Sequence, residues 1–196
     1  GNLEIESPVR LAPMAGVTNV PFRLMAKECG SALITSEEID AMGLVRHTPR
    51  SEQIAEFHST ERPLAMQLLG NDAETLVAAA EILQERGADI IDINMGCPMP
   101  KITRSGKGSA LMRDVAGTAL ILRALRRSCQ VPLTIKIRGG WDWQHLNAVE
   151  VAQMAQSEGV DAITVHPRTR SQRFAGKQDR EVGFRHCDDL VSYRTL

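Results

Sequence analysis

Residues 71–94 read NDAETLVAAAEILQERGADIIDIN, and this stretch predicts a helix followed directly by a strand. Asn71, with Glu74 three residues later, has the form of a capped helix start. Apolar residues then recur at helical spacing, and Gly87 supplies the left-handed conformation with which many helices end. The apolar run 89–94 follows at once, so the stretch is one half of a repeated α/β unit.

The same junction of a helix-ending glycine and an apolar strand recurs at residues 30–35 and 159–165. Such reuse indicates repeated βα units around a parallel sheet. The runs expected to form strands are 9–15, 32–36, 64–69, 89–94, 133–138 and 162–166, and a further helix is expected over 148–158.

Two α/β architectures use units of this kind, the doubly wound sheet and the TIM barrel. A doubly wound sheet usually carries a G-x-G-x-x-G loop after its first strand, whereas residues 13–16 read Pro-Met-Ala-Gly. We therefore expect a TIM (β/α)8-type barrel that is incomplete, with about six βα units present.

The composition suits one soluble globular domain, because 43% of the 196 residues are hydrophobic and 24% are charged. The sequence holds no apolar run of the length that spans a bilayer, and residues 1–4 lack signal-peptide features. We expect a cytoplasmic protein with no membrane partner. The four cysteines lie far apart, which predicts neither a disulfide framework nor a metal site.

The net charge of −1 excludes nucleic-acid binding by bulk charge, so any contact with RNA must be local. The candidate is the segment 166–177, which holds three arginines and one lysine. A solvated basic loop is an equally good interpretation of the charge alone.

Side chains alternate along a strand, which separates a helix-facing set from a barrel-facing set. On this basis four strands each aim a polar residue inward near the carboxyl end: Gln67, Asn94, Lys136 and His166. Each of these taken singly is more often structural than functional. Burying four such groups together is costly unless a polar ligand satisfies them, and the carboxyl ends of the strands are where TIM barrels hold their active sites.

Cys97 follows Asn94 closely, in the turn Met95-Gly-Cys-Pro98. A cysteine there can be a nucleophile, a metal ligand, a proton donor or a small hydrophobic residue. No histidine or acidic residue lies at metal-binding spacing around it. An ordinary thiol has a pKa of about 8.5 and stays protonated at neutral pH, so proton donation needs no activating partner.

Several motifs in this sequence, taken in order, resemble those of the tRNA-dihydrouridine synthases. The most specific are Asp92-Ile-Asn-Met-Gly-Cys-Pro98 and Gly106-Lys-Gly-Ser-Ala-Leu111. The others are Leu11-Ala-Pro-Met-Ala-Gly-Val-Thr-Asn-Val-Pro-Phe-Arg23, Gln67-Leu-Leu-Gly70, Thr134-Ile-Lys-Ile-Arg138 and His166-Pro-Arg-Thr-Arg170.

The resemblance implies an oxidoreductase that holds FMN at the barrel mouth, takes hydride from NADPH and reduces the C5=C6 bond of uridines in tRNA. Cys97 would be the catalytic proton donor to C5. The resemblance implies that the FMN-binding residues are Pro13, Met14, Ala15, Gln67, Lys136 and His166. It implies that the residues contacting the RNA substrate are Asn94, Arg168 and Arg170.

The resemblance covers residues 9 to about 180, which we expect to be the amino-terminal part of the FMN-binding barrel domain. In the family a seventh strand, an eighth strand and a small helical tRNA-binding domain follow, and none of these is recognisable here. Residues 181–196 show little helical periodicity and are expected to be an atypical tail of a truncated chain.

Two alternative functions stay open on the sequence. One is another FMN-dependent TIM-barrel oxidoreductase that acts on a small molecule, which the Gly96-Cys97-Pro98 turn and the 106–111 stretch disfavour. The other is an inactive remnant of a dihydrouridine synthase, which the incomplete barrel and the tail favour.

Overall fold

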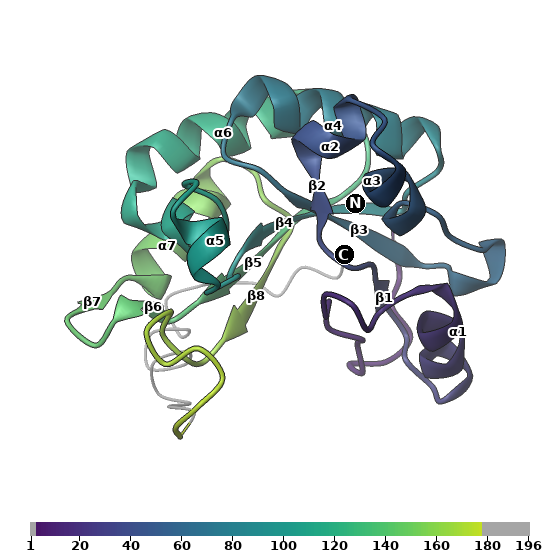
Figure 1. The fold of residues 1–196 in the computed structure, drawn as a ribbon, viewed down its shortest axis with the longest axis horizontal. Helices are drawn as coiled ribbons and strands as arrows, with labels where there is room; N and C mark the ends of the chain where they lie inside the picture. The colour runs from purple at the N-terminus through teal and green to yellow at the C-terminus, as the bar shows by residue number, and fades with distance from the viewer. Residues whose placement is uncertain (1–2, 178–196) are drawn as a thin grey trace.

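The computed structural model describes residues 3–177, and these form a curled, parallel sheet with helices on its outer face (Figure 1). The order of the strands in the sheet is β1-β3-β4-β5-β8, with β2 also pairing with β3. All of these pairings are parallel. The incomplete barrel predicted from the sequence is confirmed.

The strands of this sheet are β1 (Ile34–Thr35), β2 (Ile39–Asp40), β3 (Leu64–Leu69), β4 (Ile90–Met95), β5 (Leu133–Arg138) and β8 (Ala162–His166). A separate antiparallel hairpin is formed by β6 (Gly140–Asp142) and β7 (His145–Leu146). The α-helices are α1 (Val20–Glu28), α2 (Ala41–Val45), α3 (Pro49–Ile54), α4 (Ala73–Glu85), α5 (Pro100–Thr103), α6 (Val115–Ser128) and α7 (Ala148–Ser157). Two 3-10 helices, η1 (Ser59–Glu61) and η2 (Gly108–Arg113), complete the described elements.

The repeated helix-to-strand junction is present at all three predicted places. Gly30, Gly87 and Gly159 follow α1, α4 and α7, with φ angles of +92°, +94° and +82°. A glycine adopts this left-handed conformation at little cost, so each helix ends sharply and the chain turns into a strand.

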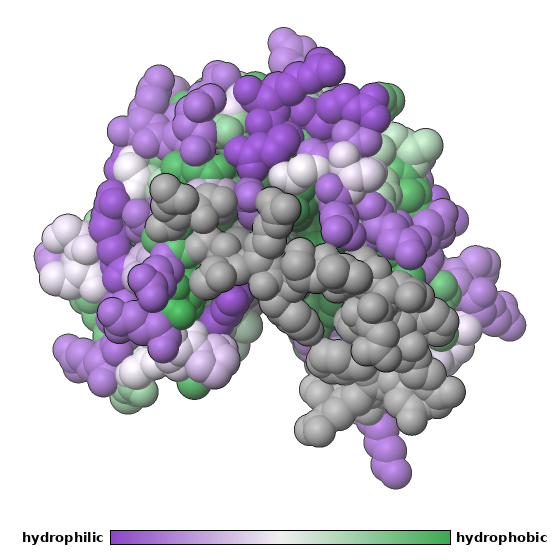
Figure 2. Space-filling view, turned by 180° about the vertical axis from the view of Figure 1, so that it is seen from behind, coloured by the Kyte–Doolittle hydropathy of each residue, from purple (hydrophilic) through white to green (hydrophobic). Residues whose placement is uncertain are grey.

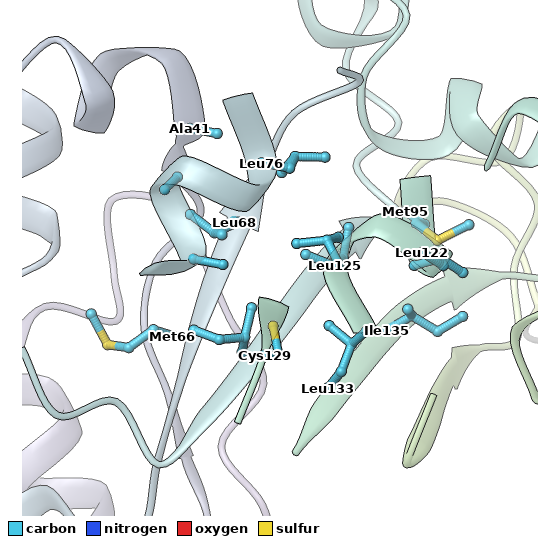
Figure 3. Close-up of a cluster of buried hydrophobic side chains, with 14 of the residues drawn as sticks. Ala41, Met66, Leu68, Leu76, Met95, Leu122, Leu125, Cys129, Leu133 and Ile135 are labelled. Atoms are coloured by element: carbon cyan, nitrogen blue, oxygen red, sulfur yellow. The ribbon is translucent and has the colours of Figure 1, made fainter. Parts of the chain in front are cut away.

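The core lies between the helices and the outer face of the sheet. Figure 3 shows Leu122 and Leu125 of α6 together with Leu133 and Ile135 of β5, and all four side chains are fully buried. Hydrophilic side chains gather over the helical side at the top of Figure 2. The helices therefore bury one apolar face each and solvate the other, as the periodicity predicts.

The first predicted strand, 9–15, is wrong as a strand. Only an isolated parallel bridge between Arg10 and Leu33 forms there, with bonds from Leu11 N to Leu33 O and from Ala32 N to Val9 O. Within residues 3–177 the segment pairs with one neighbour alone, and Pro13 has no N–H to continue the ladder.

The second predicted strand, 32–36, is shortened to β1, and a second short strand, β2, follows after a break of three residues. β1 and β2 both pair with β3, opposite Leu64–Ala65 and Leu68–Leu69 respectively. The break holds Ser36, whose hydroxyl accepts a bond from Gln67 N at 3.0 Å. The interruption leaves Glu37 and Glu38 outside the regular alternation of the strand.

No helix within residues 3–177 is both long enough and apolar enough to cross a membrane. The predicted tail 181–196 lies outside the described residues.

Candidate functional site at the carboxyl ends of the strands

The alternation of side chains brings the four predicted polar residues to one face and one end of the sheet. Asn94 of β4 is level with Lys136 of β5, and Arg138 of β5 is level with His166 of β8. Gln67 of β3 lies opposite Asp92 of β4. Four neighbouring strands therefore contribute to a single polar constellation.

Asp92 is the centre of a buried hydrogen-bond network. Thr134 Oγ1 donates to its Oδ1 at 2.6 Å, and Gln67 Nε2 donates to its Oδ2 at 2.7 Å. Burial raises the pKa of Asp92, while these two bonds and the charge of Lys136 oppose the rise. A buried carboxyl group is tolerated here because each oxygen has a donor.

Asn94 extends this network toward Cys97. Its Nδ2 donates to Gln67 Oε1 at 2.8 Å, and its Oδ1 accepts from the backbone N–H groups of Gly96 and Cys97 at 3.1 and 2.9 Å. The side chain of Asn94 therefore shapes the turn that carries the cysteine, as asparagine commonly does in tight turns.

A second set of contacts holds the carbonyl of Cys97. Ser109 donates to it twice, from N at 3.1 Å and from Oγ at 3.0 Å. Gly108 packs so closely that a Cβ there would lie 2.8 Å from Cys97 O. Both residues belong to the 106–111 stretch, so this motif serves to fix the cysteine turn.

The thiol of Cys97 is half-buried, and burial raises its pKa to about 11. A bond from the Met99 backbone opposes the rise, and the carboxyl group of Glu38, with Oε1 4.0 Å from Sγ, adds to it. The thiol is therefore held protonated at neutral pH more firmly than an ordinary cysteine, which suits an acid and not a nucleophile.

Lys136 faces a cavity of about 110 Å³ on the inner side of the sheet. The cavity is lined by Arg10, Leu11, Ala12, Pro13, Leu33, Thr35, Ala65, Asp92, Thr134, Lys136 and Thr164. Burial lowers the pKa of Lys136, and the negative charge of Asp92 opposes the effect. A half-buried ammonium group beside this cavity can hold an electron-rich ligand.

His166 brings an unsatisfied polar atom to the same end of the sheet. Its Nδ1 is buried and has no hydrogen-bond partner among the described residues. Burial lowers the pKa of His166 to about 4, and the positive charges of Arg138, Lys136 and Arg168 add to the effect. A neutral imidazole among three cations is suited to an anionic ligand, which would satisfy the free nitrogen and the charges together.

The loop 13–16 follows the first, extended segment. Met14 and Ala15 are exposed, and Gly16, with a φ of +75°, donates its N–H to Glu37 Oε2 at 2.5 Å. Thr18 Oγ1 accepts from Met14 N at 3.1 Å. The loop is thus fixed although its outer surface is open.

Comparison with known proteins identifies the family of this chain. The family model for dihydrouridine synthases matches residues 10–181. The chain belongs to the dihydrouridine synthase family. It is 40% identical over 179 residues to a probable tRNA-dihydrouridine synthase of Rhodobacter capsulatus, covering 91% of this chain and 55% of that protein.

Two further relatives are named tRNA-dihydrouridine synthase B. The Pseudomonas putida protein is 38% identical over 93% of this chain and 54% of its own length, and the Xanthomonas campestris protein is 42% identical over 90% and 53%. The chain thus spans about half the length of the curated relatives that it matches. The family match agrees with the resemblance seen in the sequence.

The two arginines expected to contact RNA are held by contacts within the protein. The guanidinium of Arg170 lies over the ring of Trp141, 4.4 Å from its centroid, and Nη2 donates to Thr103 Oγ1 at 3.3 Å. Arg170 Nε is buried without a partner among the described residues. Arg168 donates to Gly176 O at 3.3 and 3.2 Å.

Arg138 and Glu38 are among the residues of the site that were not identified from the sequence. Arg138 is buried and ties the Cys97 turn to the loop after β8, because Nε donates to Gly96 O at 2.6 Å and Nη1 to Thr169 O at 3.0 Å. Glu38 contacts both Asn94 and Cys97. The sequence feature that could have pointed to Glu38 is the pair Glu37-Glu38 directly after the predicted strand 32–36.

No cluster of three or more histidine, cysteine or acidic side chains that could hold a metal ion occurs within residues 3–177.

Proposed function

We propose that this protein is an FMN- and NADPH-dependent tRNA-dihydrouridine synthase, which reduces the C5=C6 bond of uridine in tRNA. One observation supports this proposal most strongly. A firmly protonated cysteine is fixed at the carboxyl ends of the strands, next to a polar face that suits an anionic cofactor. The family membership supports the same activity.

The residues at this end of the sheet fit FMN. Lys136 and Pro13 line the cavity, and His166 offers an unpaired Nδ1 near three cations, which suits a phosphate or the polar edge of a flavin. Met14 and Ala15 would contact the ring from the fixed first loop. When bound, FMN would supply the hydride that uracil C6 receives.

Gln67 has limited capacity for this ligand, because its side chain already serves the network. Its Oε1 accepts from Asn94, and its Nε2 donates to Asp92. One N–H and one lone pair of the amide are left for FMN. The residue would therefore bind the cofactor and hold the site together.

Cys97 would give its proton to uracil C5, while Asn94 would position both the cysteine turn and the base. Each general acid of this kind typically contributes 10²–10⁴-fold to a rate. The target uridine has to leave its stack to reach the site, and this costs a few kcal/mol. Arg168 and Arg170 would contact the RNA backbone locally, as the small net charge requires. Because the proposed substrate is tRNA, we propose that the protein acts in the cytoplasm.

Replacing Cys97 by Ala in the full-length gene product tests the proposed function. Formation of dihydrouridine in tRNA that lacks it is expected to fall by 10²-fold or more, because the acid is lost. Flavin content and NADPH oxidation are expected to stay close to wild type, because the thiol acts on the uracil alone.

The matched control is Cys29→Ala, which removes an exposed thiol at the end of α1 and is expected to change none of the three measurements. A Cys97→Ala protein that still forms dihydrouridine at a rate near wild type would remove the cysteine from the mechanism. A wild-type protein that binds FMN but never modifies tRNA would contradict the proposed function itself.

A further inference from the structure

Glu38 lies in the break between β1 and β2, beside the turn that carries Cys97. Its Oε2 accepts a hydrogen bond from Asn94 Nδ2 at 3.0 Å, and its Oε1 is 4.0 Å from Cys97 Sγ. The carboxyl group thus bridges the acid and the residue that positions it.

The acidic residues next to Glu38 in the chain form ion pairs, whereas Glu38 does not within residues 3–177. Its neighbour Glu37 has Arg50 at 3.4 Å, and Asp40 forms an ion pair with Lys107. Within residues 3–177 Glu38 forms no ion pair, although it is only half-exposed. Its polar partners there are the thiol of Cys97 and the side-chain amide of Asn94. The carboxyl group of Glu38 therefore interacts with the cysteine and with the residue that positions it.

We infer that Glu38 controls the proton of Cys97, holding the thiol in its acid form and returning a proton to it after each reaction. This inference rests on the proposed function. Glu38 acts through Cys97 and is therefore a positioning residue and proton source, not a group that touches uracil.

The step balances in protons. The S–H bond of Cys97 breaks as a C–H bond forms at uracil C5, which leaves a thiolate. Beside this thiolate the carboxylate of Glu38 takes up a proton from water, and the O–H bond so formed then breaks as the S–H bond re-forms, which leaves the carboxylate again. Water is therefore the source of the proton that Cys97 regains, and neither residue is oxidised or reduced in these steps.

The electrostatics of the pair agree with this exchange. Burial raises the pKa of Glu38, the bond with Cys97 opposes the rise, and Glu37 and Asp40 add to it. Glu38 in turn adds to the raised pKa of Cys97, which Arg138 opposes. The negative charge of Glu38 thus keeps Cys97 protonated, whereas the bond from the thiol favours the carboxylate form of Glu38, as expected when two acids share one proton.

The first experiment measures the thiol directly and needs neither flavin nor tRNA. Alkylation of Cys97 by iodoacetamide is followed against pH by peptide mass spectrometry in wild type, Glu38→Gln and Glu56→Gln. Glutamine keeps an oxygen for the bond from Asn94 but removes the negative charge. In the Glu38→Gln variant, alkylation of Cys97 at mildly alkaline pH is expected to be about tenfold faster than in wild type. A tenfold increase corresponds to a Cys97 pKa that is lower by one unit.

Glu56→Gln makes the same change at an exposed residue whose backbone, not its side chain, contacts Arg23, and its profile should match wild type. A Glu38→Gln profile that also matches wild type would overturn the inference. Because this readout is independent of catalysis, it decides on Glu38 even where tRNA is not modified.

The second experiment separates proton return from simple support of the fold. With the pre-reduced full-length gene product, the first turnover on tRNA in Glu38→Gln is expected to stay within about threefold of wild type, since Cys97 begins protonated. The steady-state rate of Glu38→Gln is expected to fall about tenfold or more. The decrease of that rate at alkaline pH, which is the alkaline limb of its pH profile, is expected to disappear. Equal losses in both phases, or a retained alkaline limb, would overturn the inference.

Discussion

Lys136 shows how one residue can link the fold to the cofactor. Its ammonium group is removed from water beside Asp92, whose oxygens already accept bonds from Thr134 and Gln67. Asp92 therefore compensates the lysine charge only in part, and burial lowers the pKa of Lys136 as a result. The remaining cost of burying the charge is offset if a polar ligand occupies the cavity.

Changing Lys136 to Met in the full-length gene product is therefore expected to strip most of the flavin. The methionine keeps the apolar stem but loses the charge that faces the cavity. Flavin content is measured from the ratio of visible to ultraviolet absorbance after purification. Lys27→Met on α1 is the matched control and is expected to retain flavin. Full flavin content in Lys136→Met would assign the lysine to structure alone.

The convergence of Gln67, Asn94, Lys136 and His166 could be predicted because the period of a strand is fixed at two residues. Glu38 could not, because it lies in a break where this alternation fails. The role of Arg138 also escaped prediction. Its partners Gly96 and Thr169 lie in loops 42 and 31 residues away, and no local pattern reports such contacts.

At the scale of elements, the strands Leu64–Leu69, Leu133–Arg138 and Ala162–His166 match their predicted bounds. The first two are continuous, deeply buried runs with parallel partners on both sides, so the apolar pattern is strong. The first predicted strand failed because pairing depends on distant neighbours, which its sequence does not encode.

The start of α4 differs from the predicted cap by one residue. Asp72, and not Asn71, is the N-cap, and its Oδ2 accepts from Thr75 N at 2.8 Å. Asn71 instead donates from Nδ2 to Ser105 O at 3.0 Å, across to the loop before the 106–111 stretch. Both are good capping residues, so local preference alone did not distinguish them.

Replacing Asp72 by Ala is accordingly expected to lower the free energy of unfolding by about 1 kcal/mol, the usual cost of losing an N-cap. Asn71→Ala leaves the cap in place and removes one exposed bond, so a loss of about 0.5 kcal/mol is expected. Urea midpoints followed by circular dichroism compare the two variants. A larger loss in Asn71→Ala would mean that the loop contact outweighs the helix cap.

At the scale of the whole molecule, the curled sheet ends in two edges. Within residues 3–177, β8 pairs with β5 alone, and β1 is covered on its outer side only by the bridge from Arg10 (Figure 1). Large apolar side chains are exposed nearby in the chain, among them Phe22 and Met25 of α1, which are 38% and 63% exposed. Open edges and exposed apolar side chains both favour association between chains.

The 196-residue chain expressed alone is therefore expected to self-associate and to hold FMN below stoichiometry, because the cavity beside Lys136 is lined by strands of a sheet that is not closed into a barrel within residues 3–177. Light scattering after size exclusion, at rising protein concentration, measures the association. Thr164 is exposed on β8 and also lines the cavity, so a lysine there would bring a charge to the edge strand, and the variant is compared for association and not for FMN content. Thr164→Lys should shift the chain toward monomer, whereas Leu120→Lys, at a residue of α6 that is 62% exposed, should not. A wild-type chain that stays monomeric and binds FMN one to one would show that the edge of β8 is already protected.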